Sequence, residues 1–391
     1  MDILIAAGAR PWEQTAIELI ESRDDLRLLR RCVDTVDLLA AAPDAAQAIA
    51  LVDRDLVGLD ADTIWQLTGS GVRVYLVATQ KPDTAELAQS LGAAGSVDAA
   101  DLTQFFVTLS AATAAHPDPR SKRTDEPGHG RIVAVWGPAG APGRTTLALG
   151  MADQFAAAAH ERVALIDADP YGGAIAGVLG VMDEVSGLLA AIRAANNGHH
   201  GAAGQSMYRV GDMDVLTGLP HAHMWMHARA AGFSKVLREA RHGWSTTVID
   251  TGFGIEDDSG PEAIAPKRNH LTLMALETAD HIVVCGSGDP VGLSRLVRGL
   301  HELHDVLPAC EPIVVVNRFR GTLGWARREI ADTVERLAGL RPDVFIPYDL
   351  HTLDKAVIEG RTVREVDPGC ALAAAYAATA GLCGRGAQLA G

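Results

Sequence analysis

Hydrophobic and polar positions alternate along this chain in two recurring patterns. Short runs rich in β-branched residues predict buried strands, whereas segments with apolar residues three or four positions apart predict helices. The two patterns follow one another along nearly the whole chain, which favours parallel sheets joined by crossover helices and hence an α/β fold. In the first half, the runs that predict strands lie at residues 3–7, 26–33, 48–52, 72–78 and 92–97.

One stretch interrupts this alternation. Residues 116–130, HPDPRSKRTDEPGHG, contain three prolines, two glycines and mixed charges but no apolar residue. Such a stretch contributes nothing to a hydrophobic core and is typical of an interdomain linker. We therefore expect a first domain at residues 1–115, the linker at 116–130, and a second domain at 131–391.

The five β/α units of the first domain resemble a response-regulator receiver, which has a flavodoxin-like fold. Asp53 follows the third predicted strand, where a receiver carries its phosphoacceptor. Ala7 and Gly8 replace the acidic pair that holds Mg²⁺ in a receiver, and Asp98 stands near the position of its lysine. Without metal ligands, a phosphoryl group on Asp53 has little to stabilise it. We expect a degenerate receiver-like docking domain, with phosphorylation of Asp53 as the alternative.

The second domain begins with a glycine-rich segment between a predicted strand and a predicted helix. The strand at residues 131–136 is followed by GPAGAPGRTT at 137–146, and a helical pattern follows. In this architecture, backbone N–H groups and a helix N-terminus bind phosphate. The usual pattern is G-x-x-x-x-G-K-[ST]; here Pro138 takes the first glycine position and Arg144 the lysine position. Taken alone, the segment is an imperfect phosphate loop.

Polar residues also follow the other predicted strands of this domain. Because the carboxyl ends of parallel strands meet at one edge of a sheet, these residues are expected to converge on one ligand site. They are Asp167 and Asp169 after the strand from residue 162, Asp250 after 246–250, the GSGDP segment after 281–285, and Asn317 and Arg318 after 312–316. This ordered set, together with the loop, predicts a nucleotide-binding domain.

The order of GPAGAPGRTT, LIDAD, VIDTG, GSGDP, VVNR and IPYD resembles the MinD/ParA group of P-loop ATPases. Within that group it is most similar to the CpaE/TadZ-like branch, which includes actinobacterial proteins called septum site-determining proteins. That branch joins a degenerate receiver-like domain to the ATPase domain. The resemblance covers residues 131–382 well and the first 110 loosely. It implies a doubly wound, mostly parallel sheet that binds ATP and Mg²⁺.

The resemblance also assigns roles around the phosphates and the metal. Thr145 would ligate Mg²⁺ directly, and Asp250, the Walker B acid, would hold the water shell of the metal. The residues that would bind the phosphates are Gly137, Gly140, Gly143, Arg144, Thr145 and Thr146.

Further roles concern catalysis, switching and the base. Asp167 and Asp169 match the switch I carboxylates, and Asp169 matches the one that positions the attacking water. Gly252 lies where a switch II amide senses the γ-phosphate, while Asn317 and Arg318 would contact the adenine.

Two departures from the family pattern bear on activity. The signature lysine, which reaches the phosphates of the partner in an ATP-bound dimer, falls on Ala139, and the loop lysine is Arg144. Arginine keeps the charge, but its planar fork cannot occupy the position of an ammonium group. Losing a cation aimed at the transferring phosphoryl group lowers the rate by a factor on the order of 10². We therefore expect ATP binding with slow or absent hydrolysis.

Two functions remain open at this stage. The resemblance implies a spatial regulator that positions division or pilus machinery, acts as a nucleotide-dependent homodimer and binds protein partners of that machinery. The alternative is a nucleotide-independent scaffold in which the phosphate loop is a relic. Ala139 and Arg144 favour the scaffold, whereas retention of Thr145 and of the three strand-end aspartates opposes it.

Composition narrows the choice of partners and compartment. The net charge of −15 argues against nucleic acid, which normally requires a basic surface. Five scattered cysteines without a C-x-x-C pair indicate reduced thiols in a cytoplasm and argue against an iron–sulfur carrier. The last residues, GRGAQLAG, lack the basic amphipathic helix of MinD proteins. We expect a cytoplasmic protein that reaches the inner face of the membrane only through a partner.

Two further segments carry expectations. The HAHMWMH segment at 221–227 predicts an amphipathic helix that faces a partner, with a metal site at its histidines as the alternative. The proline- and glycine-containing segment at 257–269 is a candidate switch or effector surface.

Overall fold

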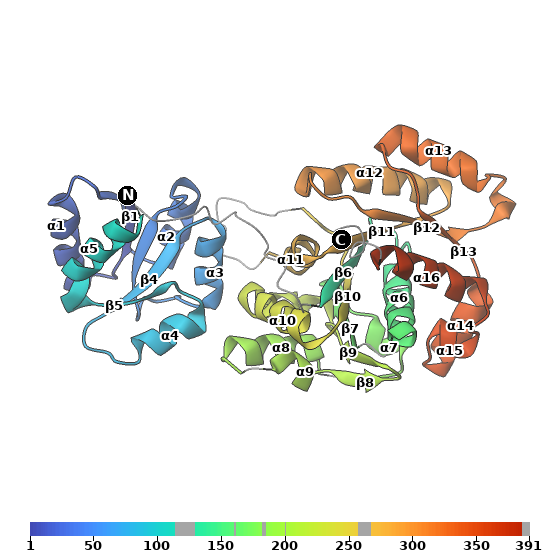
Figure 1. The fold of residues 1–391 in the computed structure, drawn as a ribbon, viewed down its shortest axis with the longest axis horizontal. Coiled ribbons are helices and arrows are strands. Elements are labelled where there is room, and N and C mark those ends of the chain that lie inside the picture. Colours follow the sequence, from blue (N-terminus) through green and yellow to red (C-terminus); the bar gives the residue numbers. More distant parts are fainter. Residues whose placement is uncertain (114–129, 160–161, 182–184, 200, 257–266, 385–391) are drawn as a thin grey trace.

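The computed structural model contains two parallel sheets, each covered by helices (Figure 1). It describes residues 1–113, 130–159, 162–181, 185–199, 201–256 and 267–384. The predicted linker, apart from Gly130, and most of the candidate switch segment, residues 257–266, lie outside these ranges. None of the described helices is long and apolar enough to cross a membrane. The α/β fold class predicted from the alternating pattern is confirmed.

The first sheet has five parallel strands in the order β2-β1-β3-β4-β5. Its strands are β1 (Asp2–Ala6), β2 (Arg27–Cys32), β3 (Ile49–Asp53), β4 (Arg73–Ala78) and β5 (Gly95–Asp98). The helices between and after them are α1 (Trp12–Glu21), α2 (Thr35–Ala41), α3 (Ala61–Gly69), α4 (Thr84–Leu91) and α5 (Leu102–Thr113). This order, with β1 between β2 and β3, is the flavodoxin-like order in which ligands bind beyond the carboxyl ends of the strands.

The second sheet has eight strands in the order β13-β12-β11-β6-β10-β7-β9-β8, and only the edge pair β8–β9 is antiparallel. Its strands are β6 (Arg131–Trp136), β7 (Val163–Ala168), β8 (Tyr208–Val210), β9 (Met213–Leu216), β10 (Thr246–Thr251), β11 (His281–Ser287), β12 (Ile313–Phe319) and β13 (Val344–Pro347). Its longer helices are α6 (Arg144–Ala159), α8 (Gly187–Asn196), α10 (Ala230–Gly243), α11 (His270–Thr278), α12 (Pro290–Val306), α13 (Arg327–Ala338), α14 (Leu350–Glu359) and α16 (Ala371–Cys383). The short helices are α7 (Ile175–Val178), α9 (Ala202–Gln205) and α15 (Val363–Val366).

Both faces of each sheet are buried. Alternate residues of β6 point to opposite sides: Val133 and Val135 pack in one core, and Ile132, Ala134 and Trp136 in the other. This explains why the strand segments are continuous apolar runs instead of alternating patterns, since a parallel sheet is covered by helices on both faces. Polar side chains stand at the carboxyl ends of the strands, and among them Asp167 and Asp250 are buried.

The histidine-rich segment differs from its prediction. Ala222–His227 forms a 3-10 helix, η3, in place of an amphipathic α-helix. The rings of His221 and His223 stack with their centroids 5.6 Å apart. Among the described residues, no group of three or more histidine, cysteine, aspartate or glutamate side chains could hold a metal ion.

The two domains contact each other through α3 and α10 (Figure 1). Asp62 of α3 accepts a hydrogen bond from the backbone N–H of Ala231 (2.9 Å) and pairs with Nε of Arg229 (2.6 Å). The Lys235 ammonium of α10 donates to the carbonyl of Ser90 at 2.8 Å, and its burial lowers the lysine pKa. Hydrogen bonds and an ion pair therefore hold the receiver-like domain against α10 of the second domain.

Replacing Asp62 by alanine is expected to loosen this contact. The change leaves the buried N–H of Ala231 without an acceptor and removes one of the two carboxylate partners of Arg229. Because Arg229 is partly exposed, we expect a loss of about 2 kcal/mol in docking free energy. Small-angle scattering should then show a larger radius of gyration. An equal radius, or the same increase in the exposed-site control Asp24→Ala, would contradict the role of Asp62.

Candidate functional site

The glycine-rich loop joins β6 to α6 and depends on glycines at two positions. Gly140 and Gly143 have φ angles of +111° and +98°, a region that side chains rarely adopt. Space is also restricted, because a Cβ at Gly143 would lie 2.3 Å from Nδ2 of Asn317. A Cβ at Gly137 would lie 2.2 Å from the carbonyl oxygen of Cys285. The loop is therefore a tight backbone turn ending at the N-terminus of a long helix, where anions bind.

Arg144, the first residue of α6, is engaged with the protein itself. Its Nη1 donates to the carbonyls of Gly137 (3.1 Å) and Pro138 (3.3 Å), and its Nε donates to the carbonyl of Thr251 (3.1 Å). Its Nη2 lies 3.7 Å from a carboxylate oxygen of Asp169. This guanidinium ties the loop to the end of β10. In this arrangement it is directed at backbone carbonyls and at Asp169.

Asp250 is buried beside Thr145 at the start of α6. It lies opposite Asp167 in the β10–β7 register and is 1% exposed, and no described residue forms an ion pair with it. The Thr145 hydroxyl lies close enough to act on it, and this contact lowers the pKa of Asp250. Burial, and then the negative charge of Asp167, outweigh this contact and raise the pKa of Asp250 well above its usual value. A buried carboxylate in this state requires either a proton or a cation.

Asp167 is held by backbone groups and by the absence of side chains around it. It accepts hydrogen bonds from the N–H groups of Ile175 (3.1 Å) and Asp169 (3.3 Å). A Cβ at Gly173 would lie 2.6 Å, and one at Gly218 2.5 Å, from atoms of its carboxyl group. Burial raises the pKa of Asp167 to about 7. The structure thus places this side chain in a closed glycine-lined niche, whereas Asp169 beside it is partly accessible.

These groups fit a magnesium ion. Mg²⁺ prefers oxygen ligands and usually keeps several waters. Thr145, half-buried in the first turn of α6, offers a hydroxyl, and the buried carboxylate of Asp250 offers acceptors for metal-bound water. A divalent cation at this position would also offset the mutual repulsion of Asp250 and Asp167.

An aromatic cluster beside the predicted switch residues escaped the sequence analysis. The ring of Tyr171 stacks on Phe253 with centroids 4.3 Å apart, and the Arg268 guanidinium lies 4.1 Å above it. The Tyr171 hydroxyl donates to the side-chain carbonyl of Asn269 at 2.9 Å. These contacts connect the segment after β7 to the segment after β10. The only signal in the sequence is an aromatic residue shortly after each strand-end aspartate.

Gly252, predicted to sense the γ-phosphate, lies at the close approach of the same two segments. A Cβ there would lie 2.7 Å from Cδ of Pro170 and 3.2 Å from a carboxylate oxygen of Asp169. Glycine is thus the residue that lets the two segments meet. Its contact with a phosphate stays a prediction.

Asn317, predicted beside the adenine, reaches the phosphate loop. Its side-chain amide donates to the carbonyl of Pro142 at 2.8 Å, and its side-chain carbonyl accepts from the N–H of Arg318. The amide is therefore already used to hold the loop in place. The adenine contact of Asn317 and Arg318 remains a prediction that would require this hydrogen bond to change.

A cavity of about 50 Å³ lies at the mouth of the loop, lined among others by Ala139, Gly140, Asp289, Arg295 and Arg318. Pockets that hold drug-sized ligands measure roughly 300–1,000 Å³. A nucleotide would therefore have to displace side chains at this mouth.

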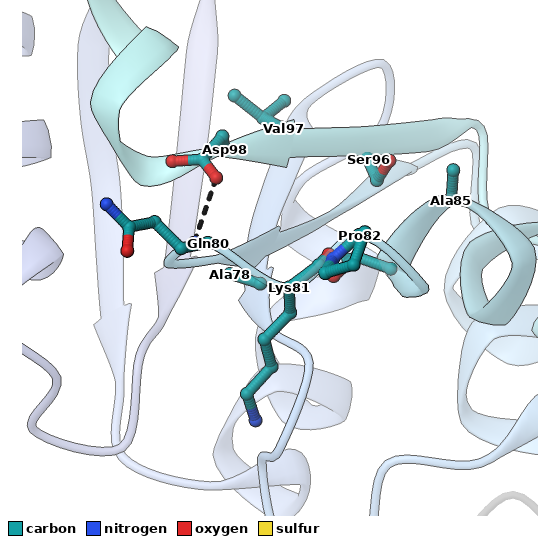
Figure 2. A pocket seen from close by; sticks show the side chains of 9 residues that line it. Ala78, Gln80, Lys81, Pro82, Ala85, Ser96, Val97 and Asp98 are labelled. Atoms are coloured by element: carbon teal, nitrogen blue, oxygen red, sulfur yellow. Dashed lines mark hydrogen bonds between the residues drawn. The ribbon is translucent and has the colours of Figure 1, made fainter.

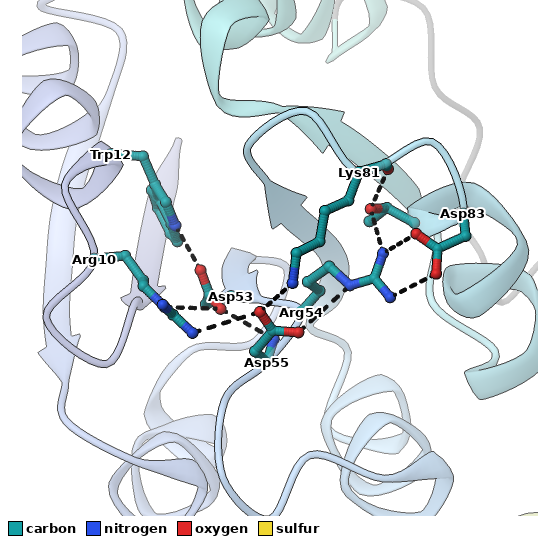
Figure 3. A network of polar contacts seen from close by, with 8 residues as sticks. Arg10, Trp12, Asp53, Arg54, Asp55, Lys81 and Asp83 are labelled. Carbon is teal, nitrogen blue, oxygen red and sulfur yellow. Dashed lines mark hydrogen bonds and ion pairs between the residues drawn. The ribbon is translucent and has the colours of Figure 1, made fainter.

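The receiver-like domain contains a separate polar network around Asp53 (Figure 3). The Asp53 carboxylate is 6% exposed, accepts from Nε1 of Trp12 at 2.8 Å and lies 3.5 Å from Nε of Arg10. The Lys81 ammonium is 2.6 Å from the carboxylate of Asp55. Arg10 thus lies beside Asp53, the position of the phosphoacceptor in a receiver, and Lys81 lies beside the neighbouring Asp55. This arrangement supports the expectation that the domain serves docking and not phosphorylation, which itself stays a prediction.

A larger cavity, about 430 Å³, lies beside this network at the ends of β4 and β5 (Figure 2). Lys81 and Pro82 line it on one side, and Ser96 and Asp98 on the other. The Asp98 carboxylate accepts from the N–H of Gln80 at 2.9 Å, and this contact fixes the loop after β4. Asp98, which stands near the lysine position of receivers, therefore holds the loop after β4 in place.

No protein-family model matches the sequence, and the search of curated proteins found no match. Solved structures do match. The cell division ATPase MinD of Pyrococcus furiosus has a TM-score of 0.50 at 18% identity, covering 65% of this chain and 98% of that one. A ParA family ATPase from Chlorobium tepidum has a TM-score of 0.51 at 15% identity, covering 64% and 98%. The septum site-determining protein MinD from Pyrococcus horikoshii, complexed with Mg-ADP, has a TM-score of 0.50 at 17% identity, covering 67% and 98%.

Identities this low carry information about the fold and not about activity. The strand order of the second sheet and its β6–loop–α6 unit agree with a phosphate-loop protein, as do the aspartates at the ends of β7 and β10. The chain therefore combines a receiver-like α/β domain with a domain of the MinD/ParA-type P-loop ATPase fold.

Proposed function

We propose that this protein binds ATP and Mg²⁺ at the loop between β6 and α6 and works as a nucleotide-dependent spatial regulator. The observation that carries the proposal is the carboxylate of Asp250, which is buried beside the Thr145 hydroxyl at the start of α6 without an ion pair to any described residue. A carboxylate buried without an ion pair destabilises the protein, and such groups are expected where a bound ligand supplies the missing hydrogen bonds or positive charge. Metal-bound water around Mg²⁺ would complete it here.

Hydrolysis is proposed to be slow or absent. The cation that should reach the transferring phosphoryl group is Arg144, and its side chain is bound to three backbone carbonyls and near Asp169. Ala139 supplies no second cation from a partner subunit. The retained Asp169, whose pKa is raised by burial against the opposing charge of Arg144, would position water in any residual reaction.

The biological role that we propose is the positioning of division or pilus machinery by a homodimer. The similar solved structures include proteins named for cell division and septum-site determination, which supports this direction. Membrane association would come through a protein partner. Accumulation of the labelled protein at the septum would favour the division role, and accumulation at the pilus base the pilus role.

Two observations favour the alternative of a nucleotide-independent scaffold. The cavity at the loop is only about 50 Å³ in volume, and Arg144 already occupies acceptors around the loop. In a scaffold the loop would be a relic without a role in nucleotide binding, and partners would bind to the receiver-like domain.

A calorimetric titration of the full chain with ATP and Mg²⁺ separates these alternatives. We expect micromolar binding that Thr145→Ala weakens by about tenfold or more, because a direct metal ligand is lost. Thr333→Ala, which changes a half-buried threonine in α13, serves as the matched control and should bind normally. Light scattering at saturating nucleotide should show a dimer. Absence of binding at millimolar ATP would reject the proposal in favour of the scaffold.

A further inference from the structure

Two arginines stand at the mouth of the phosphate loop without partners. Arg295 on α12 and Arg318 after β12 line the same small cavity as Ala139 and Gly140. Both side chains are exposed, and neither guanidinium forms a hydrogen bond or ion pair with any of the described residues. Arg144, by contrast, is bound to backbone carbonyls. These two guanidinium groups are the uncommitted cations at the loop.

Arg295 lies directly against the loop backbone. A Cβ placed on Gly140 would come within 2.0 Å of its Nη1 and 3.1 Å of its Cζ. Gly140 thus has a φ of +111° and also leaves the space that the guanidinium of Arg295 occupies. The guanidinium therefore covers the part of the loop where a terminal phosphate would be bound by N–H groups.

The helix that carries Arg295 has a fixed position relative to the loop. Asp289, which caps the N-terminus of the helix, accepts from the N–H of Gly292 at 3.0 Å, and Leu296, next to Arg295, is fully buried. One turn further on, Gly299 packs so closely that a Cβ there would lie 3.2 Å from Pro138 at the start of the loop. Arg295 thus projects from a rigid helix, which limits the positions that its guanidinium can reach.

The charge around the loop explains why such a cation is needed. Asp167, Asp169 and Asp250 lie close together and disfavour a polyphosphate, and Ala139 removes the lysine of the family pattern. A guanidinium forms paired hydrogen bonds with phosphate oxygens and is always charged. Arg295 and Arg318 lie at the mouth of the loop, are not paired with other described residues and carry guanidinium groups. They can therefore supply the positive charge that a polyphosphate requires here.

We infer that Arg295, with Arg318, provides from within the same chain the cation that binds the terminal phosphates of the nucleotide. The inference deepens the proposed function and rests on it. It names Arg295 as a binding residue selective for the number of phosphates, so that ATP and ADP gain affinity from it and AMP does not. It also makes this cation independent of a partner subunit.

The test compares Arg295→Gln with the wild-type full chain by calorimetry with Mg-ATP, Mg-ADP and AMP. We expect Arg295→Gln to weaken Mg-ATP binding about tenfold or more and to leave AMP binding unchanged, because charge-assisted hydrogen bonds to the outer phosphates are lost. Arg295→Lys should restore part of the affinity. Arg298→Gln, an exposed arginine on the same helix, should bind like the wild type.

Each other outcome has a distinct meaning. Unchanged Mg-ATP binding in Arg295→Gln would overturn the inference while leaving the proposed function intact. Tighter binding in this variant would also overturn it, since Arg295 would then be a plug that the nucleotide must displace. Absence of nucleotide binding in the wild type would reject the proposed function together with this inference.

Discussion

Asp250→Asn is expected to stabilise the protein against unfolding while weakening its Mg²⁺-dependent binding of ATP. The wild-type carboxylate is buried beside Asp167 and forms no ion pair with any described residue, so folding either buries a charge or forces protonation. Asparagine has nearly the same shape and carries no charge. We expect the free energy of unfolding near neutral pH to rise by about 2 kcal/mol, as measured by chemical denaturation. Calorimetry should show Mg-ATP affinity reduced about tenfold or more.

The pH dependence of stability tests the cause of this effect. The pKa of Asp250 and of Asp167 is higher in the folded protein than in the unfolded chain, reaching about 7 for Asp167. The folded state then binds more protons than the unfolded state, so the stability contributed by these groups is lost as pH rises from about 4 toward 7. Asp250→Asn should show a weaker pH dependence, and the two proteins should converge near pH 4.

Asp212→Asn provides the control, because this aspartate is exposed and the same chemical change there should alter neither stability nor nucleotide binding. If Asp250→Asn destabilised the protein at neutral pH, the contact of the carboxylate with the Thr145 hydroxyl would outweigh the cost of burying it. Retained Mg-ATP affinity in the same variant would separate Asp250 from the metal and remove the main support for the proposed function.

The convergence of the aspartates at one edge of the sheet could be predicted, because it depends only on where each strand ends in the sequence. Short, β-branched apolar runs that alternate with helical patterns favour buried parallel strands, and the carboxyl ends of such strands share one edge. Asp167 and Asp250 are neighbours in the β7–β10 register for this reason. The left-handed glycines of the loop follow from the same local logic, since a turn of this kind needs positive φ at Gly140 and Gly143.

The partners of the charged side chains could not be predicted, because tertiary packing selects them. Nothing in the local sequence of Arg144 indicates that it turns toward the carbonyls of Gly137 and Thr251. Arg295 reaches Gly140 only because α12 packs beside the loop, and Arg229 meets Asp60 across 169 positions of sequence. Long flexible side chains of this kind have many rotamers, and the chosen one depends on which helices become neighbours.

Arg144→Lys is expected to produce the largest gain in activity. Lysine keeps the charge but lacks the planar fork that binds the carbonyls of Gly137, Pro138 and Thr251. Its compact ammonium can reach the β- and γ-phosphates, as in other phosphate loops. We expect the steady-state rate of ATP hydrolysis to rise on the order of 10²-fold, because a cation aimed at the transferring phosphoryl group stabilises the transition state by several kcal/mol.

The increase in ATP hydrolysis should depend on the site at the phosphate loop. Asp169→Ala in the Arg144→Lys background should return turnover to the wild-type level, since Asp169 is the accessible carboxylate near the loop and lies 3.7 Å from the present guanidinium. Lys355→Arg, which makes the reverse exchange at an exposed position of α14, should leave turnover unchanged. If Arg144→Lys bound Mg-ATP but hydrolysed it no faster, Arg144 would not be the limiting group. The absence of a second cation at Ala139 would then account for the slow hydrolysis, and Ala139→Lys in the same background should restore it.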